Sequence, residues 1–374
     1  MVGPLDGITV VDLSTVIAGP YASQMLGDFG ARIIKVEPPG GDIMRAPGPA
    51  RSPGMGAAFL NCNRNKESRV LDLKNPADLV GLLALVDEAD VLLHNMRPQA
   101  IGRLGLDFAT LHARNPRLIH CSVVGYGQGG PYRDRPAYDD VIQAESGLAD
   151  LYARTAGVPR YAPTIAADKI TGLHATAAIN AALLARTASG IGQAVEVPMF
   201  ETMVSFLAVE HLAGRSFRPP IGPTGYDRLL APHRRPYETH DGHLCVMPYT
   251  GRHWRAFFMA VGRPDWADDP ALASNSERAA IIGTLYERLA ACLPSETTVH
   301  WLDLLGRLDI PCAPVNSLDA LLDDAHLNAV GMFQSMHHPT EGEIVTVRSP
   351  ITFSGTPCAI GQLALALGRS DVGA

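Results

Sequence analysis

The sequence lacks the features that mark several large classes of protein. No apolar stretch runs for about 18 residues without interruption, so no membrane-spanning helix is predicted. Lysines and arginines form no cluster and the formal net charge is −7, which argues against binding to nucleic acid. The opening residues contain no basic segment with a cleavage site after it, so we expect a cytoplasmic protein.

Metal-binding and disulfide patterns are missing as well. The 6 cysteines are spread along the chain without C-x-x-C spacing, and we interpret them as reduced, mostly buried thiols. The 13 histidines form no H-E-x-x-H pair. The sequence therefore predicts no metal site.

Apolar residues are plentiful and regularly arranged. Hydrophobic residues make up 47% of the 374 residues and charged residues 18%, enough to bury a large core. Strands are expected over 8–13, 31–36, 69–73, 91–94 and 118–124, and helices over 20–29, 77–86 and 101–114. Continuous Val, Ile and Leu runs separated by helices predict an α/β fold with an open parallel sheet.

The second half of the chain predicts another α/β unit, a linker and a smaller domain. An Ala-rich helix over 170–192, stopped at Gly190, precedes a strand over 194–197 and a helix over 200–212. Residues 214–236 contain 5 prolines and 3 glycines, which is typical of a linker. A hairpin over 237–247 with an Asp-Gly turn follows, then helices over 254–261, 277–292 and 297–308, the last with Ser295 as N-cap. We predict a large domain (1–214), a linker (215–236), an α+β domain (237–330) and a return to the large domain (331–374).

A glycine cluster and an aspartate are the first candidates for chemistry. The sequence GYGQGGP places Gly125, Gly127, Gly129 and Gly130 after a late strand, so a dinucleotide site is not expected, and both a ligand loop and a structural turn remain open. Asp168 precedes the Ala-rich helix, whose N-terminus favours the charged carboxylate. The residues alone leave it as either an N-cap or a nucleophile.

Several longer blocks resemble one family. PLDGITVVDLSTVIAGPYASQMLGDFGARIIKVEPPGGD, FLNCNRNKESRVLDLK, ADVLLHNMRP, GLDFATLHARNPRLIHCSVVGYGQGGPY and AADKITGLHATAAINAALLARTASGIGQAVEVPMFE occur in that order. Together they resemble the class III CoA-transferases of the CaiB/BaiF superfamily over nearly the whole chain. The resemblance implies a Rossmann-like large domain with an open parallel sheet, a smaller α+β domain and an interlocked homodimer.

The resemblance also implies a reaction. Such enzymes move coenzyme A between carboxylic acids without a metal, redox cofactor or prosthetic group. Asp168 matches the family's nucleophile, which forms a mixed anhydride with the acyl group and then an aspartyl-CoA thioester. The four glycines are candidates for oxyanion-stabilising amides or for a lid that excludes water.

Coenzyme A carries several negative charges, so local cations must hold it on an acidic protein. By resemblance, the CoA contacts are Val16, Ile17, Leu71, Asp72, Leu73, Lys74, Asn95, Met96, Arg97, Arg103, Arg135, Pro136, Ala137 and Tyr138. Lys74, Arg97, Arg103 and Arg135 are the expected phosphate partners. Pro38 stands where some subgroups carry an arginine.

Two alternatives to CoA transfer remain. An α-methylacyl-CoA racemase needs a histidine base at the position of Tyr138, and a tyrosine is a poor base at neutral pH. A non-catalytic CoA-binding protein is the second. The candidates for contacts to the carboxylic acid substrate are Arg234, Arg235 and Tyr249. Arginines there favour a small or dicarboxylic acid, but they fit ordinary surface charges equally well. Formyl-CoA/oxalate exchange is not expected, because its glycine-rich loop is not recognisable.

Overall fold

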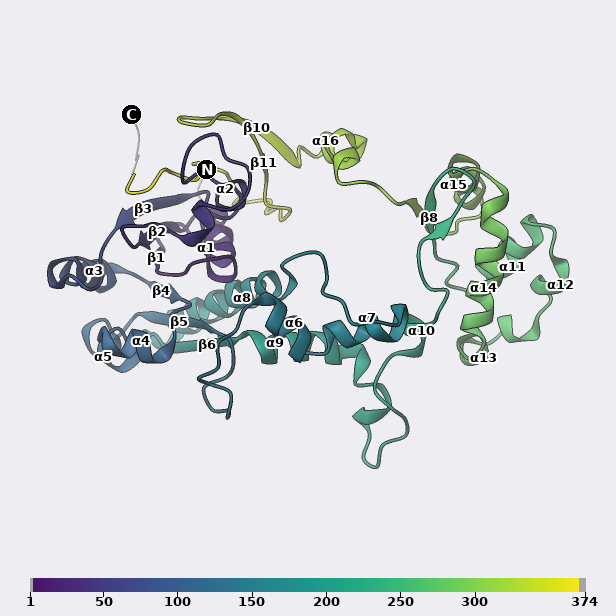
Figure 1. The fold of residues 1–374 in the computed structure, drawn as a ribbon, viewed down its shortest axis with the longest axis horizontal. Coiled ribbons are helices and arrows are strands. Elements are labelled where there is room, and N and C mark those ends of the chain that lie inside the picture. The colour runs from purple at the N-terminus through teal and green to yellow at the C-terminus, as the bar shows by residue number, and fades with distance from the viewer. Residues whose placement is uncertain (1–2, 370–374) are drawn as a thin grey trace. The chain divides into compact units, whose positions relative to one another are not determined.

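A computed structural model describes residues 3–369 (Figure 1). The chain divides into two compact units. The first comprises the described parts of Met1–Ala149 and Ala325–Ala374 together with Tyr161–Leu207, and the second comprises Asp150–Arg160 and Ala208–Asp324.

The first unit is built on a six-stranded sheet. Its strands are β1 (Thr9–Asp12), β2 (Arg32–Glu37), β3 (Lys66–Val70), β4 (Val91–His94), β5 (Ile119–Val124) and β6 (Ala194–Pro198). All neighbouring strands pair in parallel, in the order β3-β2-β1-β4-β5-β6. The predicted open parallel sheet is confirmed. The expected strand over 69–73 was misplaced, because β3 ends at Val70.

This strand order fixes where a ligand can bind. The chain runs from β1 outward to β3, and then returns to place β4 on the other side of β1. In open α/β sheets, such a reversal leaves a crevice at the carboxyl ends of the two central strands. The loops after β1 and β4 therefore flank the expected binding crevice.

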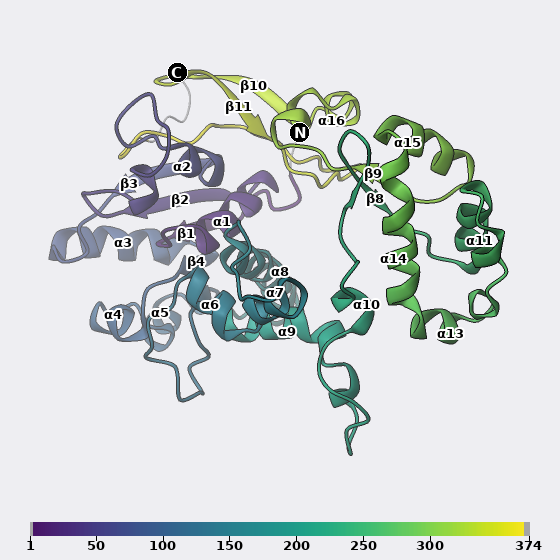
Figure 2. The same ribbon diagram turned by 45° about the vertical axis from the view of Figure 1, so that its right-hand side comes forward.

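Helices cover both faces of the sheet. In both ribbon views, α1 (Ala18–Asp28) and α8 (Ala166–Ser189) lie on one side, and α3 (Pro76–Glu88), α4 (Pro98–Arg103) and α5 (Phe108–Arg114) on the other (Figures 1 and 2). Each face buries its own cluster of strand and helix side chains, such as Val10 with Leu26 and Val11 with Leu82. The helical region expected over 101–114 consists of two helices, and Gly105 lies between them with a φ of +65°, which suits a glycine.

Further helices complete the unit. These are α2 (Ala57–Cys62), α6 (Asp139–Glu145), α7 (Leu148–Ala156), α9 (Met199–His211) and α16 (Ala325–Ala329). Most of α7 and the end of α9 belong to the second unit, which begins at Asp150 in α7 and at Ala208 in α9. Helix α8 begins four residues before the predicted start and ends at Gly190, which has a φ of +72° as expected of a C-terminal glycine.

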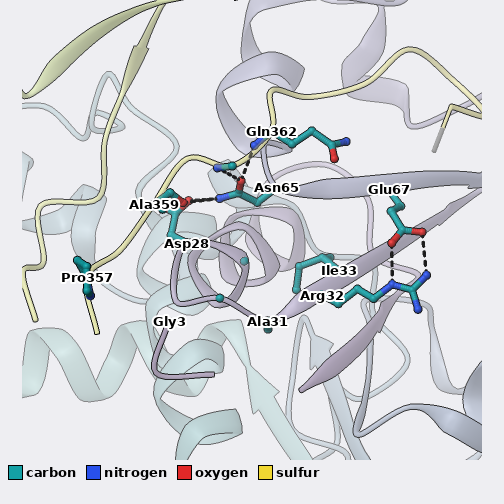
Figure 3. Close-up of a pocket in the computed structure, with 13 residues that line it drawn as sticks. Gly3, Asp28, Ala31, Arg32, Ile33, Asn65, Glu67, Pro357, Ala359 and Gln362 are labelled. Carbon is teal, nitrogen blue, oxygen red and sulfur yellow. Dashed lines mark hydrogen bonds and ion pairs between the residues drawn. The ribbon is translucent and has the colours of Figure 1, made fainter. Parts of the chain in front are cut away.

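The C-terminal part of the first unit contains a hairpin and an irregular strap. The hairpin pairs β10 (Phe333–His338) with β11 (Gly342–Val347). Residues 357–369 then run beside β3, where the Ser68 amide donates to the Arg369 carbonyl at 2.9 Å. Figure 3 shows a cavity under this strap, in which Asn65 bonds to Ala359 and Gln362. The strap thus covers the polar edge of the sheet.

The second unit is a small α+β structure. Strands β7 (Tyr237–Glu238), β8 (His243–Val246) and β9 (Cys312–Pro314) form an antiparallel sheet, accompanied by α10 (Asp227–Leu230), α11 (Gly251–Ala260), α12 (Pro264–Ala267), α13 (Asn275–Ala280), α14 (Ile282–Cys292) and α15 (Thr298–Arg307). The predicted hairpin is confirmed. Thr297, not Ser295, caps α15, because its side chain accepts the His300 amide. No helix within residues 3–369 combines the length and hydropathy needed to cross a membrane.

Candidate active site

A cavity of about 230 Å³ opens at the carboxyl ends of the central strands. Thr15 and Val16 follow β1, Asn95 follows β4 and Gly125 follows β5, and all of them line it. The cavity therefore occupies the crevice that the strand order predicts.

The structure brings together many of the residues predicted from the sequence. Those that line the cavity are Val16, Asn95, Met96, Arg97, Gly125, Arg135, Ala137, Tyr138 and Asp168. Gln128 and Met199 also line it and were not predicted. The predicted residues among them come from five separate chain segments that meet at one site.

Other predicted contacts lie outside this lining. They are Ile17, Leu71, Asp72, Leu73, Lys74, Arg103, Pro136, Gly127, Gly129 and Gly130 in the first unit. In the second unit, Arg234 and Arg235 are exposed, and Tyr249 lines a different cavity. Their roles stay predictions.

Asp168 lies inside α8, in its first turn. The helix begins at Ala166 and has Ile165 as its N-cap, so the N-cap interpretation of Asp168 is wrong. The residue is 7% exposed and lines the cavity. Burial, and secondly the nearby Asp139 carboxylate, raise the pKa of Asp168 to about 6. The sequence analysis considered only the helix N-terminus, which favours the charged carboxylate, and missed these two opposing effects on the pKa.

Asp139 is a close neighbour that the sequence analysis missed. One of its carboxylate oxygens accepts the Asp168 amide at 3.0 Å, and the other accepts the Gln143 side chain. The side-chain oxygen Oε1 of Gln143 in turn accepts the Ala162 amide at 2.9 Å. These bonds tie the start of α6 to the start of α8. The only feature of the sequence that could have pointed to Asp139 is that it directly follows Tyr138, one of the predicted CoA contacts.

Val16 adopts a backbone conformation that is unusual for its type. Its φ is +71°, in the left-handed region that β-branched residues avoid. Its amide donates to the Asp42 carboxylate at 3.2 Å. Just before it, the Thr15 amide and carbonyl bond the Asn95 side chain at 3.0 and 2.8 Å. The loop after β1 is thus fixed on both sides by polar side chains.

A buried ion pair supports that loop. The Lys35 ammonium lies 2.9 Å from the Asp42 carboxylate and also donates to the Ser14 carbonyl at 2.9 Å. Both side chains are almost completely buried. Because the lysine lies on β2 and the aspartate beyond its end, the pair anchors the loop to the sheet. Sequence reasoning assigned no role to either residue.

A second buried carboxylate lies at the end of β1. Asp12 accepts from Ser14 and Ser23 and lies 3.3 Å from the Lys66 ammonium. Burial lowers the pKa of Lys66 to about 8, against the opposing effect of Asp12. Burial by itself would raise the pKa of Asp12, but Lys66 and Lys35 hold it below its usual value. This charge cluster links the end of β1 to the start of β3.

The glycine segment after β5 is held by glutamates. The Gly127 amide donates to Glu201 at 2.9 Å, and the next amide donates to Glu196 at 3.0 Å. The Gly130 amide donates to the Gly127 carbonyl. At Gly125, a Cβ atom would lie 2.3 Å from the Cβ of Ala137, so only a glycine fits there. Because these amides are already bonded within the protein, the structure favours the structural turn over the ligand loop for this segment.

Comparison with known proteins identifies the family. The sequence profile of CoA-transferase family III matches residues 5–369. The chain belongs to this family. Its relatives include a succinate--glutarate CoA-transferase of Agrobacterium fabrum, 36% identical over 95% of this chain and 90% of that protein. A succinyl-CoA:glutarate CoA-transferase of Mus musculus is 32% identical over 94% and 81% of the two chains.

A solved structure and a further relative agree with this assignment. A CaiB/BaiF family protein from Brucella suis matches with a TM-score of 0.83 and 30% identity, covering 98% of this chain and 97% of that one. A formyl-CoA:oxalate CoA-transferase of Rhodopseudomonas palustris is 30% identical over 96% and 90% of the two chains. This family III protein is therefore a CoA-transferase, an enzyme whose substrates are CoA thioesters and carboxylates.

Proposed function

We propose that this CoA-transferase moves coenzyme A from an acyl-CoA to a small or dicarboxylic acid through covalent intermediates on Asp168. The observation that carries the proposal is the placement of this carboxylate: it is nearly buried, it lies in the first turn of α8, and it faces the crevice after β1 and β4. Arg97 and Arg135 line the same cavity and are proposed partners for the phosphates of CoA.

The reaction conserves the thioester in four exchanges. An Asp168 oxygen attacks the thioester carbonyl, the C–S bond breaks, and a mixed anhydride and CoA thiolate form. The thiolate attacks the aspartyl carbonyl and expels the donor carboxylate, leaving an aspartyl-CoA thioester. The acceptor carboxylate displaces the thiolate to give a second anhydride. The thiolate then attacks the new acyl carbonyl and regenerates the Asp168 carboxylate, with no net change in protons.

The chain's relatives support a dicarboxylic acid. The Agrobacterium and mouse proteins are named for succinate or succinyl-CoA together with glutarate. We propose succinyl-CoA and glutarate as the first pair to assay. The proposed assembly is a homodimer, which light scattering during gel filtration would test.

The test is a matrix of acyl-CoA donors and carboxylic acid acceptors followed by mass spectrometry. Asp168→Asn is expected to lower kcat by about 10³-fold or more, because it removes the nucleophile. Asp140→Asn, which changes an exposed acid on α6, is the matched control. Hydroxylamine trapping must label a peptide that contains Asp168. Labelling elsewhere, or full activity of Asp168→Asn, would refute the mechanism.

A chiral 2-methylacyl-CoA in deuterated water separates transfer from racemisation. Tyr138 lines the cavity at the position where a racemase would need its histidine. We expect CoA exchange without deuterium at the α-carbon. Deuterium incorporation without exchange would favour the racemase alternative, and neither reaction with any acid would favour a non-catalytic CoA-binding protein.

A further inference from the structure

The second unit contains a separate cavity of about 610 Å³. Its walls come from α10, from the segment between β8 and α11, and from α13 and the start of α14. The volume is within the range typical of small-molecule sites, about 300–1,000 Å³. The sequence predicted one residue of this cavity, Tyr249, and nothing of its shape.

Arg228 is the first of two arginines that line it. Its Nε atom donates to the Tyr286 hydroxyl at 3.1 Å, and an Nη atom lies 3.4 Å from the Met247 sulfur. Its guanidinium lies 4.8 Å from the centre of the Tyr249 ring. All of these partners are neutral, although the side chain is half-buried.

Arg278 is the second arginine and is only 9% exposed. Its guanidinium donates to the Leu272 carbonyl at 3.1 Å, to the Ser274 carbonyl at 3.3 Å and to the Asn275 side chain. These acceptors are neutral as well. Within residues 3–369, no carboxylate forms an ion pair with either arginine.

The charge balance of the cavity is therefore positive. Asp227 is the one acidic residue of the lining, and it is exposed. Burying a cation without a counter-ion is costly, because the lost hydration is not replaced by an opposite charge. A bound carboxylate would supply that charge, and the planar guanidinium fork matches its two oxygens.

We infer that this cavity binds a carboxylate group of a small dicarboxylic acid. The choice of a dicarboxylic acid rests on the proposed function, but the argument for a bound carboxylate rests only on the two arginines without a counter-ion. The acid is bound either as the acceptor substrate or as an effector, and the experiment separates these two cases. The apolar part of the lining, including Trp254 and Ile282, suits the methylene chain of the acid.

Calorimetric titration of the full chain with glutarate and with glutaramide tests the inference. Glutaramide is the diamide of glutarate, so it has the same carbon chain but no negative charge. We expect glutarate to bind at least 10-fold more tightly, and Arg228→Gln to remove that preference. Arg255→Gln, at an exposed arginine of α11 outside the cavity, is the matched control and should keep it. Trp254 fluorescence gives a second readout.

Several outcomes overturn the inference. They are equal binding of glutarate and glutaramide, unchanged glutarate binding by Arg228→Gln, and equal losses in the two variants. If Arg228→Gln does not fold by circular dichroism, Arg228→Lys replaces it: the charge remains but the fork is lost, so a smaller loss of the same preference is expected, and no loss overturns the inference.

Activity measurements keep this inference distinct from the proposed function. If glutarate is an acceptor, Arg228→Gln raises its KM at least 10-fold and leaves the KM of the acyl-CoA unchanged. Glutarate binding by a chain that transfers CoA to no acid would refute the proposed function and support an effector site. Transfer to glutarate with an unchanged KM in Arg228→Gln, together with unchanged binding, would retain the function and refute this site.

Discussion

At the residue scale, the proposed nucleophile is distinguished by its surroundings more than by its type. The chain has 38 acidic residues, but Asp168 combines burial, a cavity and a second carboxylate nearby. Burial and Asp139 act in the same direction on its pKa. A carboxylate with a raised pKa is a better nucleophile once ionised, since basicity and nucleophilicity rise together, but it must lose its proton first.

This balance predicts an acid limb in the pH profile. Since the pKa of Asp168 is raised to about 6, kcat/KM should fall about tenfold per pH unit below pH 6. Asp139→Asn removes the smaller cause and should move the limb to lower pH, while Asp140→Asn should leave it in place. Measuring kcat/KM from pH 4 to 8 for an acyl-CoA whose acyl group has no carboxylate of its own checks this. A wild-type limb near pH 4 would contradict it.

The buried pair of Lys35 and Asp42 gives a second prediction at this scale. Removing one partner leaves the other charge buried and unpaired, so Asp42→Asn and Lys35→Met should each lower the free energy of unfolding by about 3 kcal/mol. The double variant should be more stable than the sum of the two losses implies, as urea unfolding would show. Purely additive losses would mean that the two charges do not stabilise each other.

At the element scale, the site depends on how strand ends meet helix starts. β5 ends at Val124, and α6 begins at Asp139 after the segment that contains Ala137. Gly125 lies so close to Ala137 that there is no room for a side chain at position 125. The segment 135–138, which contains Tyr138, therefore packs directly against the end of β5.

Gly125→Ala should therefore disturb the cavity. The added methyl group would lie 2.3 Å from the Ala137 Cβ, so the segment must move, at a cost of about 1–3 kcal/mol. We expect a raised KM for the acyl-CoA and a lower melting temperature. Gly125→Ala combined with Ala137→Gly removes the clash and should restore both. Failure of this rescue would show that Gly125 has a role other than close packing.

At the scale of the whole molecule, buried titratable groups link stability to pH. His94 lies at the end of β4, 2% exposed, with its ring 4.9 Å from that of His120. Burial, and secondly His120, lower the pKa of His94 to about 3. In the unfolded chain this histidine takes up a proton near pH 6.5, so the unfolded state binds more protons between pH 6.5 and 3.

Acid should consequently unfold the protein, and His94 should account for part of the effect. Its contribution is complete above pH 6.5 and is lost as the pH falls, by up to about 4 kcal/mol near pH 3. Asp168 opposes this trend, because its raised pKa makes the folded state bind a proton first. Urea unfolding of wild type and His94→Leu at pH 7, 5.5 and 4 should therefore show that the free energy of unfolding falls less with pH in the variant. If it falls equally in both proteins, His94 does not contribute to acid unfolding.

The sequence by itself determined the parallel sheet, most of its strands, the family and the identity of Asp168 as the candidate nucleophile. These follow from local apolar periodicity and from side chains that match in order along the chain, both of which can be read without coordinates. The tertiary structure alone decided the pKa of Asp168, the support of Val16 by Asp42, and the cavity around Arg228. In each case, the deciding partner comes from another segment: Asp139 lies 29 residues before Asp168, and Asp42 lies 26 after Val16. Burial and charge depend on such neighbours, and only the folded chain brings them together.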